Sequence, residues 1–250
     1  MDIAGQELEC VRIGIDRPGP TLIFLHEGLG SVALWRDFPQ RVADATAHPA
    51  LAYSRAGYGR STSTSAARTP RYMHDEALVT LPALLDALGI ADVILIGHSD
   101  GASIALIHAG ARVRPVRALV AMAPHVFVEA LSIAGIAQAK DDYESTDLRT
   151  KLGRYHVDVD SAFRGWNDIW LSPAFRDWNI EPYLSGIACP LLLIQGRDDE
   201  YGTLAQLDAI ERQVSGRVER VELADCGHSP HRDQPSATLA AIADFVSTLR

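Results

Sequence analysis

Short apolar runs alternate with amphipathic stretches along most of the chain. The apolar runs cover residues 21–25, 50–53, 92–96, 118–122, 190–194 and 217–223. Most of them are apolar at nearly every position, which is typical of strands buried on both faces of a parallel sheet. Helical spacing marks the stretches 72–88, 102–112, 204–214 and 235–249, with Pro82 predicting a kink or break in the first. The pattern predicts an α/β fold with a mostly parallel central β-sheet flanked by helices.

The alternation of strands and helices pauses between Ala123 and Ala188. This stretch holds three of the four tryptophans, Trp166, Trp170 and Trp178, and no clear strand pattern. We predict a helical cap or lid at residues 126–184, an element that excludes water and shapes substrate access. Residues 1–125 and 185–250 then form one core, since 250 residues can fold around one sheet in this class.

One short motif joins a predicted strand to a predicted helix. Gly97-His98-Ser99-Asp100-Gly101 follows an apolar run and precedes the helical stretch 102–112. The pattern G-x-S-x-G occurs by chance in many proteins, but in this context the two glycines permit a sharp turn that exposes the serine hydroxyl above the sheet. The following helix then aims its N-terminal N–H groups at the same place. Ser99 is therefore the predicted nucleophile.

A serine hydroxyl is a poor nucleophile at neutral pH and needs a base within hydrogen-bond reach. Among nine histidines, His228 lies between the last predicted strand and the C-terminal helix, at the carboxyl edge of the sheet, where sites of such folds collect. His231 is the competing choice. The third member must be a carboxylate that fixes the tautomer of the imidazole. Asp198, Asp199 and Glu200 follow the run 190–194 and all three compete for this role, in the chain order serine, acid, histidine.

Two more glycine-rich loops complete a recognisable set of motifs. His26-Glu27-Gly28-Leu29-Gly30-Ser31 follows the first predicted strand, and Arg55-Ala56-Gly57-Tyr58-Gly59-Arg60-Ser61 follows the second. With the G-x-S-x-G turn and the Gly-His pair ending at residue 228, they make the chain similar to the α/β-hydrolase superfamily over nearly its whole length. The resemblance implies a serine hydrolase with a helical cap inserted after the sixth strand.

The same resemblance implies roles for single residues. The family's G-x-x-D motif starts at Gly196 and so selects Asp199 as the acid, while its terminal G-H motif selects His228 as the base. The oxyanion hole falls on the backbone N–H groups of Gly28 and Asp100. Donors of this kind stabilise the tetrahedral intermediate of acyl transfer.

Two acidic residues depart from the family's pattern beside the predicted oxyanion hole. Glu27 stands where the family usually has glycine, and Asp100 follows the nucleophile. Either the two side chains turn away into loop hydrogen bonds, or they face the pocket, where they disfavour anionic substrates and could hold an amine or hydroxyl. Arg55 is a candidate to neutralise one of them. Glu27 is one candidate substrate-binding residue. The others are four aromatic residues that could line a pocket under the cap: Trp35, Phe127, Trp166 and Trp170.

Composition narrows the possible partners. The formal net charge of −9, without a Lys/Arg cluster, argues against nucleic acid. No uncharged apolar run is long enough for a membrane span, and the N-terminus lacks the pattern of a signal peptide. Cys10, Cys189 and Cys226 are widely separated and outside metal-ligand spacing, which predicts reduced thiols in a cytoplasmic protein. We expect a small-molecule substrate and no metal or other cofactor, and leave a homo-oligomer open.

The predicted activity is hydrolysis of a small carboxylic ester, lactone or thioester through an acyl-enzyme intermediate. Three alternatives stay open. One is hydrolysis of a carbon–carbon bond in a dienone-type ring-cleavage product. Another is aminopeptidase-like hydrolysis of an amide, in which Glu27 holds the substrate amine. The third is a non-catalytic receptor, because a fold alone does not guarantee activity.

Overall fold

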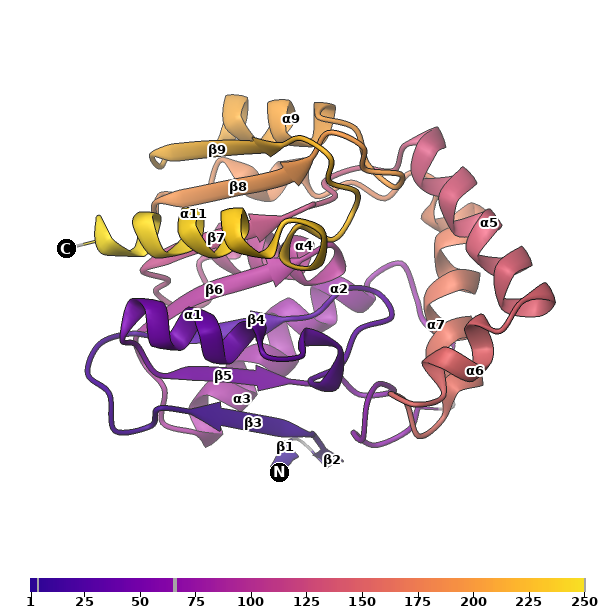
Figure 1. Cartoon of the computed structure of the whole chain (residues 1–250), viewed down its shortest axis with the longest axis horizontal. Helices are drawn as coiled ribbons and strands as arrows, with labels where there is room; N and C mark the ends of the chain where they lie inside the picture. The colour runs from indigo at the N-terminus through magenta and orange to yellow at the C-terminus, as the bar shows by residue number, and fades with distance from the viewer. Residues whose placement is uncertain (4, 65–66, 250) are drawn as a thin grey trace.

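A mostly parallel β-sheet forms the centre of the protein (Figure 1). The computed structural model describes residues 1–3, 5–64 and 67–249. The seven strands lie in the order β3-β5-β4-β6-β7-β8-β9, with β3 antiparallel to β5 and the other pairs parallel. Their bounds are β3 (Cys10–Ile13), β4 (Thr21–Leu25), β5 (Ala50–Tyr53), β6 (Val93–His98), β7 (Ala118–Met122), β8 (Leu191–Gly196) and β9 (Val218–Leu223).

The burial of the strands follows their sequence patterns. Every residue of β5, β6, β7 and β8 is buried, as are four of the five in β4, which explains their nearly continuous apolar sequences. The edge strand β9 is partly exposed and carries Glu219, Arg220 and Glu222. Charged side chains on an edge strand discourage pairing with other chains. All six predicted strands are present; β4, β5 and β7 match the predicted bounds, and the ends of β6, β8 and β9 are shifted by at most two residues.

Helices cover both faces of the sheet (Figure 1). On one face, α1 (Phe38–Thr46) packs beside α11 (Pro235–Ser247), and their apolar residues share a buried cluster with one side of the strands. The opposite face is covered by α3 (Leu81–Ala87), α4 (Asp100–Ala111) and α9 (Ala205–Gln213), which contribute to a second cluster. The sheet is therefore the middle layer of three.

The helix predicted at residues 72–88 is interrupted, as Pro82 suggested. It consists of α2 (Tyr72–Asp75), a π-helical segment η2 (Glu76–Thr80) and α3. Pro82 is the second residue of α3, directly after the π-helical segment, and the backbone stays helical through Thr80 and Leu81.

The stretch between β7 and β8 is helical. Its elements are α5 (Ala130–Ser145), α6 (Leu148–Leu152), α7 (Val159–Leu171), a 3₁₀ turn η3 (Pro173–Phe175) and α8 (Glu181–Leu184). Helices α5, α6 and α7 lie beyond the carboxyl ends of the strands, as Figure 1 shows, whereas α8 packs against α4 and α9.

The position of this insertion differs from the prediction in one respect. It follows β7, which is the fifth strand of the large sheet along the chain rather than the sixth. The cause lies at the N-terminus, where β1 (Asp2–Ile3) and β2 (Gln6–Glu7) are two residues each and pair only with each other in the described structure. They form a separate two-stranded sheet instead of adding a strand to the large one.

Cys10, Cys189 and Cys226 are free thiols. Among the described residues, no helix has the length and apolar character needed to cross a membrane.

Gly101 offers a test of how tightly α4 packs on the sheet. A Cβ atom at this position would overlap the backbone carbonyl of Leu25 at the end of β4. Because backbone cannot move aside cheaply, Gly101→Ala should lower the free energy of unfolding by about 1–3 kcal/mol. Gly153→Ala is the matched control, since no atom would lie closer than 3.4 Å to its new Cβ. Urea titration measures both variants, and equal stabilities would contradict the packing described.

Candidate active site

Ser99 occupies a strained turn between β6 and α4. Its backbone has φ 53° and ψ −119°, a conformation that residues with a side chain rarely adopt. Gly97 and Gly101 on either side make the turn possible, because a Cβ on either one would meet backbone atoms of this same turn or of β4. The turn places the serine at the carboxyl end of β6, directly before the first residue of α4.

The structure brings Ser99, His228 and Asp199 together in one hydrogen-bonded line. His228 Nε2 lies 2.9 Å from Ser99 Oγ. On the other side of the ring, Nδ1 lies 2.8 Å and 3.0 Å from the two carboxylate oxygens of Asp199. An ionised carboxylate only accepts hydrogen bonds, so Nδ1 carries the proton and Nε2 is left to accept the serine hydroxyl. This arrangement is suited to removing a proton from Ser99.

The local contacts distinguish Asp199 from its acidic neighbours. Asp199 is buried and accepts N–H bonds from Tyr201 at 2.8 Å and Gly202 at 3.1 Å. Asp198 is exposed, and Glu200 accepts the backbone N–H of His228 at 3.1 Å instead of reaching its ring. Of the three carboxylates, Asp199 is the one that orients the imidazole.

Each member of the His228–Asp199 pair stabilises the ionised form of the other. Burial alone would lower the pKa of His228, but the hydrogen bond to Asp199 and its negative charge outweigh burial, and the pKa is raised. Burial likewise favours the neutral acid in Asp199, yet the bond to His228 lowers the pKa of this carboxyl. The site therefore stabilises the imidazolium that forms when the serine loses its proton.

Two backbone N–H groups beside Ser99 are free to donate into the cavity. Gly28 and Asp100 both line the cavity above Ser99, and neither N–H donates a hydrogen bond to any residue that the structure describes. The indole of Trp166 packs directly against Gly28, so any side chain at that position would collide with it.

Hydrogen bonds from two buried side chains fix the loop that carries Gly28. His26 and Arg55 both donate hydrogen bonds to the carbonyl oxygen of Glu27, each at 2.7 Å. The backbone N–H of Arg55 donates in turn to His26 Nε2 at 3.0 Å. Burial and the nearby Arg55 charge hold the pKa of His26 well below its usual value, so its ring stays neutral in this role.

The two acidic departures from the family's pattern have different orientations. The carboxylate of Asp100 turns away from the cavity, accepting the Tyr72 hydroxyl at 2.7 Å and lying 3.7 Å from Arg55 Nη1. Arg55 thus neutralises Asp100. Glu27 lines the cavity, with Oε2 3.5 Å from His98 Nδ1. Burial opposes its ionisation, but the neighbouring His98 outweighs burial and lowers the pKa of Glu27.

The cavity above Ser99 has a volume of about 380 Å³. Two of the predicted aromatic residues, Trp166 and Trp170 from α7, contribute to its wall. Phe127 and Trp35 do not line it. Phe127 forms an isolated β-bridge with Asn179.

Trp35 is a correction to the predicted pocket. It is 2% exposed and packs against Phe24, Phe38 and His231, in the core between the sheet and helices α1 and α11. The loop after β4 passes over that face of the sheet before it enters α1, and this carries the indole away from the cavity.

Sequence reasoning missed two histidines that approach the catalytic line. His98 Nε2–H donates to the carbonyl oxygen of His228 at 2.7 Å and so holds the loop of the predicted base. His125 lines the cavity with its ring centroid 5.6 Å from that of His228. Both lie at or just past the carboxyl end of a strand, which is the signal that could have identified them.

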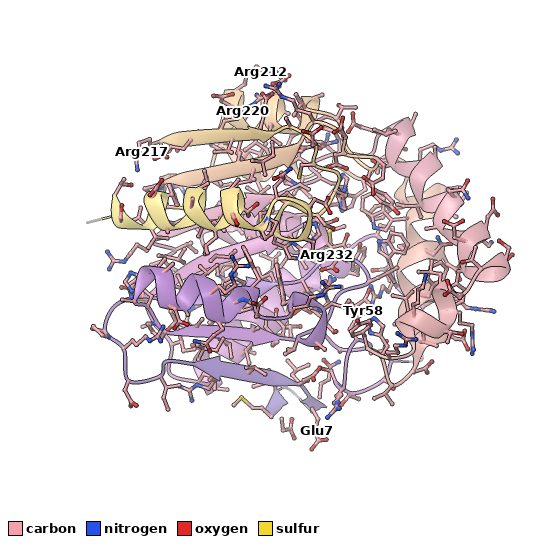
Figure 2. The ribbon with its side chains drawn as sticks, viewed as in Figure 1. Glu7, Tyr58, Arg212, Arg217, Arg220 and Arg232 are labelled. Atoms are coloured by element: carbon pink, nitrogen blue, oxygen red, sulfur yellow. The ribbon has the colours of Figure 1, made fainter. Side chains whose placement is uncertain are left out.

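The other charged residues of the cavity wall are mostly acidic. Glu200 and Asp233 join Glu27, whereas Arg232 is the one cationic side chain among the described lining residues. Figure 2 shows Arg232 between the core and the helices beyond the strand ends, and Arg212, Arg217 and Arg220 far from it around β9 and α9. Within residues 1–3, 5–64 and 67–249, no group of three or more histidine, cysteine or acidic side chains is arranged to hold a metal ion.

Comparison with known proteins identifies the family. The family model described as the alpha/beta hydrolase family matches residues 22–242. The chain therefore belongs to the alpha/beta hydrolase family, which confirms the predicted fold class and the prediction of a hydrolase.

Solved structures agree with this assignment. A membrane phospholipase A, described as a bacterial virulence factor, has a TM-score of 0.81 at 19% identity, covering 100% of this chain and 85% of that one. An enol-lactonase from Burkholderia xenovorans has a TM-score of 0.76 at 18% identity, and the match covers 98% of both chains. The meta-cleavage product hydrolase CumD from Pseudomonas fluorescens has a TM-score of 0.73 at 16% identity, and the match covers 99% of this chain and 97% of that one. At these identities the likeness establishes the fold alone.

Replacing each of two neighbouring acids tests the assignment of Asp199. Asp199→Asn should lower kcat by about 10³-fold or more, because the amide cannot hold the imidazole in the required tautomer. Asp198→Asn should change it by no more than about twofold, since that side chain is exposed. Steady-state hydrolysis of a 4-nitrophenyl ester measures both, and the reverse ranking would show that the wrong acid has been assigned.

The raised pKa of His228 predicts the acidic limb of the pH profile. The base must be neutral to accept the serine proton, so kcat/KM should fall as the pH drops through the pKa of His228. Because Asp199 raises that pKa from the ordinary value of 6.5, the midpoint should lie above 6.5. A pH profile of kcat/KM with a midpoint clearly below 6.5 would contradict the electrostatic account.

Proposed function

We propose that the protein hydrolyses a small carboxylic ester, lactone or thioester through an acyl-enzyme intermediate. The observation that carries the proposal is the line from Ser99 Oγ through His228 to Asp199, with contacts of 2.9 Å and 2.8 Å, at the floor of a cavity. A nucleophile, a base in reach of it and a carboxylate that orients the base form the arrangement that acyl transfer requires.

The first half of the reaction forms the acyl-enzyme. Ser99 Oγ attacks the carbonyl carbon while its proton passes to His228 Nε2. The negative charge that develops on the carbonyl oxygen is stabilised by the N–H groups of Gly28 and Asp100. The imidazolium, held by Asp199, then gives its proton to the leaving oxygen or sulfur as the bond to the carbonyl carbon breaks.

The second half returns the enzyme to its starting state. A water molecule takes the place of the leaving group and loses a proton to His228 as it attacks the acyl carbon. The second tetrahedral intermediate collapses, Ser99 recovers its proton from the imidazolium, and the carboxylic acid leaves. The cycle uses only groups that this chain supplies.

The cavity supports a small substrate. Its volume of about 380 Å³ is at the lower end of the range for ligand sites. Trp166 and Trp170 bring apolar surface from α7, which is part of the predicted cap at residues 126–184. We extend the proposal to this segment, whose helices α5 to α7 would limit access of water and of bulky esters.

A second candidate reaction is hydrolysis of a carbon–carbon bond. It is favoured by the structural similarity to the meta-cleavage product hydrolase, in which the chains superimpose over nearly their full lengths. The enol-lactonase supports the first candidate in the same way. A dienone-type ring-cleavage compound, a panel of 4-nitrophenyl esters, a lactone and an aminoacyl arylamide separate these activities, because each is followed by its own colour change or acid release.

Removal of the nucleophile tests the proposal itself. Ser99→Ala should leave the fold intact and lower ester hydrolysis by about 10⁴-fold or more. Ser145→Ala, at an exposed position near the end of α5, is the matched control and should retain full activity. A fluorophosphonate probe should label the wild-type protein and the control but not Ser99→Ala, as measured by intact-protein mass spectrometry.

The labelling result separates a catalyst from a binding protein. Folded wild-type protein that takes up no probe would overturn the proposed function and favour a non-catalytic receptor. Equal turnover by Ser99→Ala and wild type would show that the reaction uses another group.

A further inference from the structure

His125 is a buried polar side chain of the cavity wall that the proposed mechanism does not use. It is 3% exposed and follows β7 by three residues. The hydroxyl of Ser103 in α4 fixes the backbone of His125. It donates a hydrogen bond to the carbonyl oxygen of His125 at 2.6 Å and accepts one from its N–H at 3.3 Å. Since α4 begins directly after Ser99, the backbone at His125 is held in place relative to the nucleophile.

The ring is enclosed by three neighbours. The edge of Trp170 meets it with ring centroids 5.3 Å apart, and the ring of His228 lies 5.6 Å away. Gly202 closes a third side, because a Cβ there would lie 3.2 Å from His125 Cε1 and 3.5 Å from Nδ1. With the Nδ1–Cε1 edge against Gly202, the opposite edge, which carries Nε2, is left to face the cavity.

Neither nitrogen of this ring makes a hydrogen bond to a residue that the structure describes, and Nδ1 is fully buried without a partner. Nδ1 lies against Gly202 and is closed off from the cavity, whereas Nε2 is not fully buried. Nε2 is therefore the nitrogen that a ligand in the cavity can reach. Because nothing fixes the tautomer, Nε2 can either donate or accept.

The charges around His125 restrict the group that it can bind. Burial and the neighbouring His228 lower the pKa of His125 to about 3, so the ring is neutral wherever the proposed hydrolase works. The cavity wall also carries three acidic side chains, Glu27, Glu200 and Asp233, against Arg232 as the single cation among the described lining residues, and Asp199 lies behind His228. An anionic group near this ring would be repelled, whereas a hydroxyl can donate to it and accept from it.

We propose that His125 is a specificity-determining residue that binds an uncharged hydroxyl group of the substrate, close to the reacting carbonyl. This inference rests on the proposed function, since it concerns the same cavity. The hydroxyl belongs to either the acyl part or the leaving group of the ester, because His125 adjoins His228, which serves both. The substrate class is therefore a small hydroxy-substituted ester or lactone.

The test compares matched esters with and without the hydroxyl. One arm uses 4-nitrophenyl butanoate against 4-nitrophenyl 3-hydroxybutanoate, and the other uses propyl butanoate against 2-hydroxypropyl butanoate, followed by acid release. The wild-type protein should prefer the hydroxylated member by about tenfold or more in kcat/KM in one arm. The arm that shows the preference identifies the side of the ester that carries the hydroxyl.

Three variants assign this preference to the ring. His125→Phe should bring the ratio of the two kcat/KM values to within about twofold of one, while His125→Gln, which keeps a donor and an acceptor, should retain part of the preference. His231→Phe is the matched control. His231 is 5% exposed with an unpartnered Nδ1, and burial lowers the pKa of its ring to about 3, but it packs on Trp35 and is not among the residues lining the cavity. This variant should keep the full ratio.

The outcomes separate this inference from the proposed function. Fluorophosphonate labelling of Ser99 in every variant shows that each is folded and competent, so that the ratios can be compared. A wild-type protein that is labelled but shows no preference in either arm would overturn the role of His125, as would an unchanged ratio in His125→Phe. Failure of the wild-type protein to be labelled would instead overturn the proposed hydrolase.

Discussion

The close approach of α4 to the sheet is the constraint on which the site depends. Gly101 in the first turn of α4 lies against the carbonyl of Leu25, and Gly97 lies against the backbone of the same turn. Only with both glycines can the chain reverse within one residue, and that residue is Ser99, with φ 53°. The packing of helix on strand therefore stores the strain that exposes the nucleophile. The proposed oxyanion donor on Asp100 and the backbone of His125, which is hydrogen-bonded to Ser103, are placed by the same helix.

Hydrogen bonds and one ion pair stabilise the buried carboxylates around this turn. Asp199 accepts hydrogen bonds from His228 and two backbone N–H groups, and Asp100 is paired with Arg55 and accepts the Tyr72 hydroxyl. Burying a single charge would be costly, whereas a paired and hydrogen-bonded one is tolerated. Tyr72 also accepts the indole N–H of Trp170 at 3.0 Å, so the network reaches from the turn to α7. This network accounts for an acidic residue directly after the nucleophile without placing its carboxylate in the cavity.

Much of the fold could be predicted from the sequence because its central strands are buried on both faces. The short strand β3 was missed because it is partly exposed and pairs along one edge only. Helix α1 was missed although its buried residues Phe38, Val42 and Ala43 have helical spacing. Local patterns identify an element best when they are long or fully apolar.

The candidate site shows the same limit. Motifs separated Ser99, His228 and Asp199 from their competitors because each motif fixes a residue to a strand end. An aromatic residue that will be buried has no comparable motif to fix its position in the fold. Trp35 and Trp166 are equally plausible wall residues in the sequence, and only the tertiary path of the chain places one in the core and the other in the cavity.

The central claim is that His228 joins Ser99 to Asp199 through its two nitrogens, and nitrogen-15 NMR of the histidine-labelled protein tests it most directly. Comparison with His228→Gln assigns the signals of this ring among those of the nine histidines. Above its pKa, the account predicts a proton on Nδ1 and none on Nε2. A neutral ring that carries its proton on Nε2 would contradict it, because that tautomer can neither bond to Asp199 nor accept the proton of Ser99.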